Sequence, residues 1–279
     1  MKEEKVMKDF RKEIFLTACT ATNAHLASSF SIVEIIYTLY IRNVLKIDAE
    51  NPNSEDRDIF ILSKGHGSLA LYTALYYRNF FDKKILRSFA KKGSILGGEP
   101  CVGMIPGIEA ATGSLGHGLS IGVGVALAKK LDNRDEKVYV LLGDGECQEG
   151  TIWEAVMSAA HYKLDNLITI VDCNKIQKMG TLEDIMSINS WKERFSSFGF
   201  MVEEVDGHDI DALEKCLRKE NKSGKPKVIL ANTIKGKGVS IIENNPRWHW
   251  KLPNKKELKA IVEELNISEE ELEECKKLI

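Results

Sequence analysis

Three acidic residues follow an apolar run in the stretch GDGECQEG, residues 143–150. The preceding run, KVYVLL, is typical of a buried strand, and the acids are Asp144, Glu146 and Glu149. A loop that binds an anion would carry Lys or Arg, so this composition predicts that the loop binds a cation. The residue types therefore indicate a metal site where the strand ends.

Asn174, in VDCNKI, follows the next apolar run, thirty residues after Asp144. This spacing is that of one β-α-β unit, so both side-chain oxygens can reach one point if the two strands are neighbours. Together with a backbone carbonyl they are hard oxygen ligands, which suit Mg²⁺ or Ca²⁺. Phosphate oxygens usually complete a Mg²⁺ site, and Gly145 and a helix that begins near Thr151 would let a phosphate approach.

Each signal also has a simpler interpretation. GDG alone is typical of a tight turn, and Asn174 alone could cap one. Their pairing at β-α-β spacing, each after an apolar strand, favours the site. The pattern predicts a metal ion that in turn holds a diphosphate.

The elements that must position these residues alternate between strands and helices. Apolar runs predict strands over 58–62, 137–142, 166–172, 199–207 and 227–233. The continuous apolar character of the second and third runs and the helix between them predict an α/β fold, a parallel β-sheet flanked by helices on both faces. The loops after residues 62, 142, 172 and 233 all follow carboxyl ends of strands, where such folds bind ligands.

The remaining segments of the sequence are predicted to be one long loop and a series of helices. A long loop over 93–113 is too apolar for a disordered segment, which indicates a functional loop. We expect a single domain over 1–279, which includes an N-terminal helical segment, 1–50, and C-terminal helices, 254–279. Within the N-terminal segment, helices are predicted over 5–20 and 30–45, and further helices are predicted over 67–80, 82–91, 114–131, 151–162 and 209–220.

Composition excludes several classes of protein. The 279 residues are 43% hydrophobic and 29% charged, which is ordinary for a globular protein. A net charge of −2 gives no indication that the protein binds nucleic acid or an anionic membrane. No apolar stretch reaches the ~18 residues of a spanning helix, and the N-terminus lacks a signal-peptide core. Six scattered cysteines without a C-x-x-C pair predict free thiols in the cytoplasm and argue against zinc.

Several motifs together resemble a known family. GDG followed by Asn174 resembles the thiamine diphosphate motif, and SKGHGS, IPGIEAATGSLGHGLS, GDGECQEGTIWEA and ENNPRWHW resemble the N-terminal, diphosphate-binding half of transketolases. The similarity extends over nearly the whole chain. It is closest to the split form, in which this half is a separate polypeptide.

The resemblance implies a role for each matching residue. Asp144, Asn174 and the carbonyl of Ile176 would bind Mg²⁺, or Ca²⁺ as a substitute. His25 would line the donor-sugar pocket, and Glu149 and Glu154 match acids at a subunit interface that link two active sites, Glu149 with a catalytic role. Contacts to thiamine diphosphate would come from His66, Gly113, Ser114, Leu115, Gly143, Asp144, Gly145, Glu146, Asn174, Ile176 and His249, with His66 and His249 also at the reacting centre.

The implied activity is transfer of a two-carbon ketol unit from a ketose to an aldose phosphate. The glutamate that activates the cofactor, and most of the arginines that bind sugar phosphates, lie on a second domain in transketolases. The resemblance therefore implies a separate C-terminal, pyrimidine-binding subunit, with an α₂β₂ assembly and an inactive isolated chain. His161 and His208 are interpreted as surface or satisfied core residues, and His117 as a residue behind the site.

Three positions depart from the family pattern. GGEP places Glu99 where many relatives read GGHP, and an ionised carboxylate accepts hydrogen bonds but cannot donate them. Lys178 and Met179 replace the usual residues after the metal motif, and Trp250 in WHW replaces the commoner Gly of WHG. Glu99 is a candidate donor-contacting residue, with His25 and His249. The departures suggest an unusual donor or acceptor and leave the predicted metal ligands intact.

Two other interpretations remain. The chain could belong to another thiamine diphosphate enzyme, as a 2-oxoacid dehydrogenase α subunit or a deoxyxylulose-phosphate synthase relative. Neither accounts as well for ENNPRWHW and IPGIEAATGSLGHG. A non-catalytic paralogue is the other alternative, against which the intact acidic motif argues.

Overall fold

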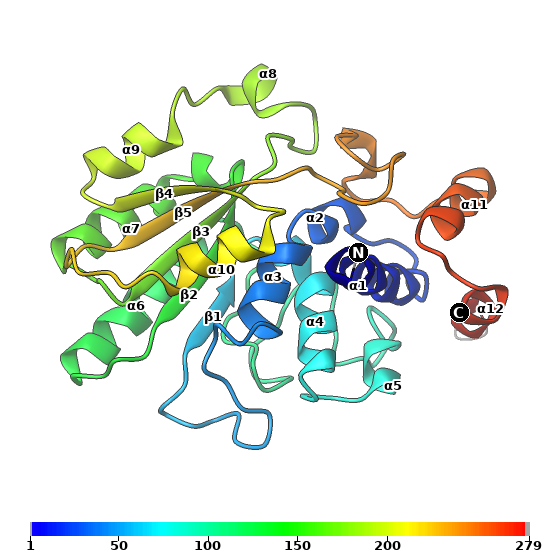
Figure 1. Cartoon of the computed structure of the whole chain (residues 1–279), viewed down its shortest axis with the longest axis horizontal. Helices are drawn as coiled ribbons and strands as arrows, with labels where there is room; N and C mark the ends of the chain where they lie inside the picture. The colour runs from blue at the N-terminus through cyan, green and yellow to red at the C-terminus, as the bar shows by residue number, and fades with distance from the viewer. Residues whose placement is uncertain (1, 277–279) are drawn as a thin grey trace.

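A five-stranded parallel sheet forms the centre of the computed structural model, which describes residues 2–276. The strands lie in the order β1-β2-β3-β5-β4, and every neighbouring pair is parallel. This arrangement confirms the predicted fold class (Figure 1). The strands are β1 (Ile59–Leu62), β2 (Val138–Gly143), β3 (Leu167–Cys173), β4 (Met201–Asp206) and β5 (Lys227–Asn232).

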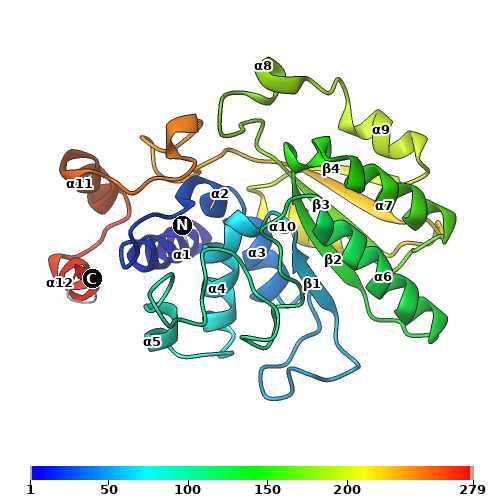
Figure 2. The ribbon, with the colours of Figure 1, turned by 180° about the vertical axis from the view of Figure 1, so that it is seen from behind.

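Helices cover both faces of the sheet, as Figures 1 and 2 show from opposite sides. The α-helices of the described chain are α1 (Lys2–Ala18), α2 (Leu26–Phe30), α3 (Val33–Tyr40), α4 (Ser68–Tyr77), α5 (Lys83–Leu86), α6 (His117–Leu131), α7 (Gly150–His161), α8 (Leu182–Met186), α9 (Trp191–Ser197), α10 (Ile210–Arg218), α11 (Lys255–Glu264) and α12 (Glu269–Lys276). Three short 3₁₀ helices join them, η1 (Gly65–Gly67), η2 (Glu146–Gln148) and η3 (Pro246–Trp248).

Alternate residues of each strand enter two separate cores because successive side chains of a strand point to opposite faces. Phe60 and Leu62 of β1 join the core formed with α1 to α4 and α10. Ile59 and Ile61 join the core formed with α6, α7 and α9. Strands β1, β2, β3 and β5 are therefore buried on both faces, which explains their largely apolar sequences, whereas the edge strand β4, MVEEVD, is only partly buried.

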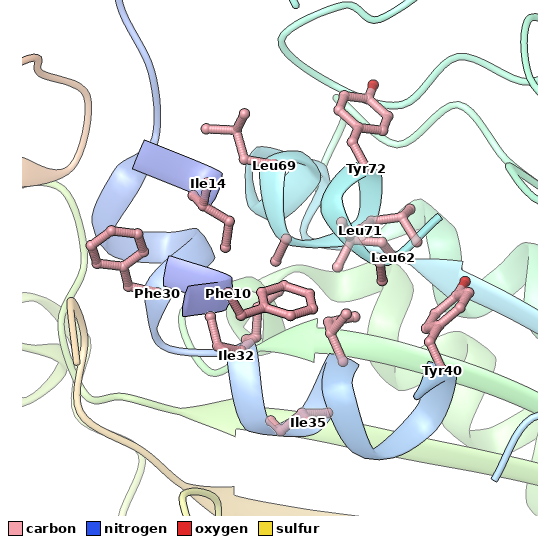
Figure 3. Close-up of a cluster of buried hydrophobic side chains, with 14 of the residues drawn as sticks. Phe10, Ile14, Phe30, Ile32, Ile35, Tyr40, Leu62, Leu69, Leu71 and Tyr72 are labelled. Carbon is pink, nitrogen blue, oxygen red and sulfur yellow. The ribbon is translucent and has the colours of Figure 1, made fainter. Parts of the chain in front are cut away.

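The first core fixes the N-terminal helices against β1 (Figure 3). Phe10 and Ile14 of α1 lie among Phe30 of α2, Ile32 and other buried side chains, and each is at most 1% exposed. Burying one such side chain contributes about 1.5–3 kcal/mol. This packing anchors the segment around α2, which begins directly after His25.

Some helices differ from the sequence prediction. The helix expected over 30–45 is the shorter α3, because residues 31–32 form a turn after α2, in which Ser31 donates its hydroxyl to the buried Asp172, and α3 ends at Tyr40. The helix expected over 82–91 is only the short α5, and Ala90 after it has a left-handed φ of 54°. Two short helices, α8 and α9, were not predicted; Thr181 and Ser190 cap them.

The loops after β1, β2, β3 and β5 leave one edge of the sheet, as predicted, because all four strands are parallel. In the described chain, residues 93–113 form neither helix nor strand. Helix α1 packs against α4 and α12. No helix within residues 2–276 is long and apolar enough to cross a bilayer.

Candidate active site

Asp144 lies directly after β2, beside the end of β3, where Gly143 pairs with Asp172. Its side chain is buried, and its two oxygens accept the backbone N–H groups of Gly145 at 2.7 Å and Lys175 at 2.5 Å. Burial, and then the charge of Asp172, raises the pKa of Asp144 to about 6. A cation beside this carboxylate would offset both effects.

Asn174 lies next to Asp144, as the β-α-β spacing predicted, and Ile176, which the family resemblance added, lies beside them. The three residues line one cavity of about 950 Å³ at the edge of the sheet. Asn174 donates its side-chain N–H to Asp172 at 2.8 Å, and its oxygen accepts the backbone N–H of Ile176 at 3.1 Å. The carbonyl oxygen of Ile176 accepts a hydrogen bond from Lys235 Nζ at 2.7 Å, so it already faces a positive charge.

Asp172, near the end of β3, connects several of the loops that follow the strands. Its carboxylate is fully buried and accepts hydrogen bonds from Lys64, Ser31 and Thr233 as well as from Asn174. Burial alone would raise the pKa of Asp172, but the Lys64 ammonium and the three hydroxyl and ammonium hydrogen bonds hold it below its usual value. The ionised carboxylate thus fixes the orientation of the Asn174 amide.

Sequence reasoning missed Lys64, Asp172 and Lys235. Lys64 is the lysine of SKGHGS, and Lys235 follows β5 in TIKGKG, so both stand in loops that were recognised as site-forming. Both are almost completely buried. The sequence did contain a signal for both residues, because each lysine comes shortly after an apolar strand. A lysine that is buried there needs an anionic or polar partner at the same edge of the sheet.

Three histidines from distant parts of the chain form one cluster. His25 lies just before α2, His66 lies within η1, and His249 directly follows η3. Their ring centroids are 5.2 Å apart for His25 and His249, and 5.6 Å apart for the two pairs that include His66. The structure therefore brings together the three histidines that the sequence singled out.

The histidines are neutral at pH 7. Burial, and then the charge of Lys235, lowers the pKa of His25 to about 4 and that of His249 to about 3. Burial and the charge of Lys64 lower the pKa of His66 well below its usual value. Lys235 also connects the cluster to the cavity, because its Nζ lies 3.3 Å from Nδ1 of His249.

Two of the departures from the family pattern lie at this site. Trp250 is 57% exposed and stacks on His25 with ring centroids 6.0 Å apart and an interplanar angle of 16°. The Glu99 carboxylate covers Gly113, since a Cβ there would lie 2.1 Å from its Oε2. Ser68 Oγ donates to the carbonyl of Gly98 at 2.7 Å and so holds the Glu99 loop on α4.

Glu99 also lies close to the histidine loop. The residue before Gly113 packs on Gly65, where a Cβ would lie 2.5 Å from the Thr112 carbonyl oxygen. Gly65 precedes His66 directly. Glu99, the turn at Gly113–Leu115 and the loop that carries His66 are therefore contiguous. Lys178 is close enough to His25 and His249 to lower the pKa of both.

The side chain of Gln177 covers Gly145, so the backbone at Gly145 is not freely accessible. A Cβ on Gly145 would lie 3.1 Å from Cγ of Gln177, and Gln177 Nε2 is buried without a hydrogen-bond partner among the described residues. An orphaned amide donor therefore lies over the loop where the sequence predicts a diphosphate. Together with the Lys235 ammonium, it gives the site donors that suit an anionic oxygen.

The remaining predicted acids have different surroundings. The buried Glu146 accepts hydrogen bonds from Ser63 and from the N–H groups of Gly116 and Gly143, so its carboxylate joins three loops. Glu149 and Glu154 are exposed on or beside α7. Within residues 2–276, no hydrogen bond or ion pair joins either side chain to the histidine cluster.

The donor set fits a hard cation better than a soft one. Among the described residues, no group of three or more His, Cys, Asp or Glu side chains is arranged for a metal ion. One carboxylate, one amide oxygen and one carbonyl on the same cavity wall match the oxygen preference of Mg²⁺ and Ca²⁺. The residue types therefore fit the predicted metal and a diphosphate, and metal binding at the Ile176 carbonyl would require the Lys235 ammonium to move away from that oxygen.

A family model described as the thiamine diphosphate binding domain of transketolase matches residues 5–274. The chain belongs to this family. As a transketolase-family protein it is similar to curated proteins of nearly equal length. It is 41% identical to an apulose-4-phosphate transketolase subunit of Actinobacillus succinogenes, with 94% of this chain and 95% of that protein covered.

Two further curated relatives are similar over most of their length. The chain is 38% identical to an apulose-4-phosphate transketolase subunit of Phocaeicola vulgatus, with 94% and 93% of the two chains covered. It is 39% identical to 6-deoxy-6-sulfo-D-fructose transketolase subunit SqwG of a Clostridium species, with 86% and 88% covered. The predicted N-terminal transketolase subunit is confirmed by these matches.

Solved transketolases share the fold. The transketolase of Campylobacter jejuni superposes with a TM-score of 0.85 at 30% identity, over 98% of this chain and 46% of that chain. A transketolase variant of Pichia stipitis gives a TM-score of 0.87 at 25% identity, over 100% of this chain and 45% of that chain. This transketolase-family chain therefore spans less than half the length of these solved enzymes.

Proposed function

We propose that this chain is the diphosphate-binding subunit of a two-chain transketolase, a transferase that moves a two-carbon ketol unit from a ketose to an aldose phosphate. Family membership supports the cofactor and the reaction class. The observation that carries the proposal is the position of Lys235. Its ammonium contacts both the Ile176 carbonyl and His249, and so joins the histidine cluster to the cavity of Asp144 and Asn174.

In this proposal Asp144, Asn174 and the Ile176 carbonyl bind Mg²⁺, with Ca²⁺ as a possible substitute. The ammonium of Lys235 and the orphaned amide of Gln177 supply donors for diphosphate oxygens. The other cofactor contacts would come from residues around the same loops, namely His66, Gly113, Ser114, Leu115, Gly143, Gly145, Glu146 and His249. Glu146 would act indirectly, because its carboxylate holds the loops together.

Thiamine diphosphate, when bound, supplies the carbanion chemistry that cleaves the bond beside a ketose carbonyl. The protein supplies neutral imidazoles where sugar hydroxyls must gain or lose protons. His25, His66 and His249 are suited to this work because their depressed pKa values leave a lone pair available at pH 7.

The proposal includes a separate pyrimidine-binding subunit, which would join this chain in an α₂β₂ assembly. Two relatives that match this chain in length are named as subunits of a transketolase, which supports a second chain. In this assembly Glu149 and Glu154 are interface acids, a role that their exposed positions on and beside α7 allow. Glu149 would act in catalysis only through that interface.

Glu99 supports a sugar donor over a 2-oxoacid donor. An ionised carboxylate accepts hydrogen bonds from hydroxyls and repels a second carboxylate. Its position over Gly113 places it beside the proposed cofactor turn. Trp250 adds bulk next to His25, so the donor pocket is narrower than one that carries glycine there.

The test is reconstitution with a candidate pyrimidine-binding subunit, thiamine diphosphate and Mg²⁺. Donors would include xylulose 5-phosphate, apulose 4-phosphate, 6-deoxy-6-sulfo-D-fructose and pyruvate, with ribose 5-phosphate and glyceraldehyde 3-phosphate as acceptors. Turnover of any ketose by the pair, and not by the chain alone, supports the proposal. Turnover of pyruvate alone, or enzyme-like rates without the partner, contradicts it.

The Glu99→His variant sharpens that test. Xylulose 5-phosphate turnover by the wild-type pair means that Glu99 is compatible with an ordinary donor. Turnover that is gained only in Glu99→His means that this position selects a different ketose. Failure of the wild-type pair to bind thiamine diphosphate would favour a non-catalytic paralogue.

A further inference from the structure

His208 lies between two charged or polar partners behind the site. It follows β4 in the sequence DGH, and its Nδ1 lies 2.9 Å from Oε2 of Glu34 in α3. Its Nε2 accepts the backbone N–H of Ile234, just after β5, at 2.8 Å. The sequence interpretation as a satisfied residue holds, but each of its two ring nitrogens contacts a different element.

These contacts define one tautomer of His208. The Ile234 N–H can only donate, so Nε2 must carry the lone pair and Nδ1 the proton. The proton on Nδ1 then points at Glu34, which is itself bound by Arg11 of α1 at 2.8 and 2.9 Å. Burial opposes ionisation of Glu34, yet Arg11 and the His208 hydrogen bond hold its pKa below the usual value.

The backbone that His208 holds leads directly into the site. Ile234 precedes Lys235, whose Nζ contacts the Ile176 carbonyl and His249. The next residue, Gly236, donates its N–H to the carbonyl of Ala27 at 3.0 Å, in the helix that follows His25. Segment 234–236 is therefore attached at its start by His208 and contacts the site through its next two residues.

We propose that His208 is a positioning residue, which uses its Nε2 lone pair to hold segment 234–236 so that Lys235 reaches the active site. Arg11 and Glu34 act behind it by fixing the orientation and tautomer of the ring. The part of this inference that concerns the cofactor rests on the proposed function. The part that concerns the segment does not.

The competing explanation is that His208 merely supports α3 through Glu34. Two substitutions separate the explanations, because Gln extends to the position of Nε2 while Asn ends near Nδ1. His208→Gln keeps an acceptor for Ile234, and His208→Asn keeps a donor for Glu34. If His208 positions segment 234–236, the His208→Gln variant should behave like wild type. If His208 only supports α3, the His208→Asn variant should behave like wild type.

The first experiment is hydrogen exchange of the whole chain without cofactor, read by mass spectrometry over peptides that contain residues 233–240. We expect His208→Asn to raise exchange at this segment by about 5- to 10-fold, the effect of one lost hydrogen bond, and His208→Gln to raise it far less. Equal exchange in both variants would overturn the proposal. His161→Asn, at the exposed end of α7, is the matched control.

The second experiment measures binding of thiamine diphosphate and Mg²⁺ to the reconstituted pair by calorimetry. We expect His208→Asn to weaken binding by about 5- to 10-fold through misplaced Lys235, with His208→Gln closer to wild type. Equal binding by both variants, while wild type binds, overturns the cofactor part of the inference. A wild-type pair that does not bind at all contradicts the proposed function and leaves the exchange result decisive.

A third measurement needs no variant and so remains informative if a substitution prevents folding. Long-range ¹H–¹⁵N spectra of wild-type histidine rings report which nitrogen carries the proton. We expect His208 to show an unprotonated Nε2 and a protonated Nδ1 at pH 7. A protonated Nε2 would break the Ile234 hydrogen bond and would overturn the proposal.

Discussion

Nζ of Lys235 lies 3.3 Å from Nδ1 of His249. The same ammonium donates to the carbonyl of Ile176 at 2.7 Å, so a single positive charge faces both the histidines and the end of β3. Burial, and then the charge of Lys64, lowers the pKa of Lys235 to about 8. The ammonium is therefore charged at pH 7, in a place where an anionic ligand would stabilise it further.

Lys235→Met should raise the pKa of His249. Burial is the larger cause of its value of about 3, and the Lys235 charge is the next. Methionine removes the charge and keeps most of the side-chain length, so the second cause disappears. Histidine NMR titration measures the change, and Lys237→Met, two residues along the chain, is the control. Identical His249 titrations in the two variants would contradict the prediction.

The folded state should lose stability as the pH falls from 6.5 towards 4. His25 has a pKa near 6.5 when unfolded and about 4 when folded, so the unfolded chain binds the proton first. Protonation thus favours the unfolded state across this window, and stability rises with pH through it. Thermal melts between pH 7.5 and 4.5 should give a shallower slope for His25→Gln than for wild type. Parallel slopes would exclude this role for His25.

Asp172→Asn should destabilise the fold severely. Lys64 would remain buried without its counter-charge, and breaking one side of such a pair costs about 3–5 kcal/mol. Urea unfolding measures the loss. Adding Lys64→Met to the same chain should recover part of it, because no unpaired charge is then left. A double variant less stable than Asp172→Asn would show that Lys64 is satisfied in another way.

Glu146→Gln and Glu149→Gln should differ although the two residues are three positions apart. Glu146 is buried and accepts the N–H groups of Gly116 and Gly143, so an amide NH₂ would face one donor, at a cost of about 1–3 kcal/mol. Glu149 is exposed, and its substitution should stay within about 0.5 kcal/mol. Urea unfolding of both variants decides. Similar losses would mean that Glu146 does not hold the loops.

Trp250→Gly should change donor preference without changing stability. The indole is 57% exposed, so little packing is lost, but it covers His25 at a centroid distance of 6.0 Å. Removing it opens the proposed donor pocket. Ratios of kcat/KM across a ketose panel, measured on the reconstituted pair, should broaden relative to wild type, and Trp250→Phe should stay close to wild type. Unchanged ratios would place Trp250 outside the donor pocket.

Much of the fold could be predicted because β1, β2, β3 and β5 are buried on both faces and therefore read as apolar runs; β4 is partly exposed and carries three acids. Asp144 and Asn174 could be paired for the same reason, since strand ends and a β-α-β spacing are local properties of the sequence. The start of the helix expected over 30–45 could not be predicted, because the turn before α3 places Ser31 against Asp172, far away in the chain.

The residues that were missed share one property. Lys64 pairs with Asp172 and Lys235 contacts Ile176, and the two residues of each pair are separated by many residues along the chain. No periodicity or motif within one segment reports such a contact. Helices α8 and α9 were missed for a different reason, since they are too short to establish a period, and only Thr181 and Ser190 mark their starts.

The order of the site residues along the chain has a consequence for biosynthesis. A nascent chain that has emerged from the ribosome only as far as β3 and the residue after it already carries His25, His66, Asp144 and Asn174. It still lacks β5, which lies between β3 and β4 in the sheet, and with it Lys235 and His249. Asp144 and Asn174 are therefore synthesised before Lys235 and His249, so the complete site can form only after the residues that follow β5 have emerged.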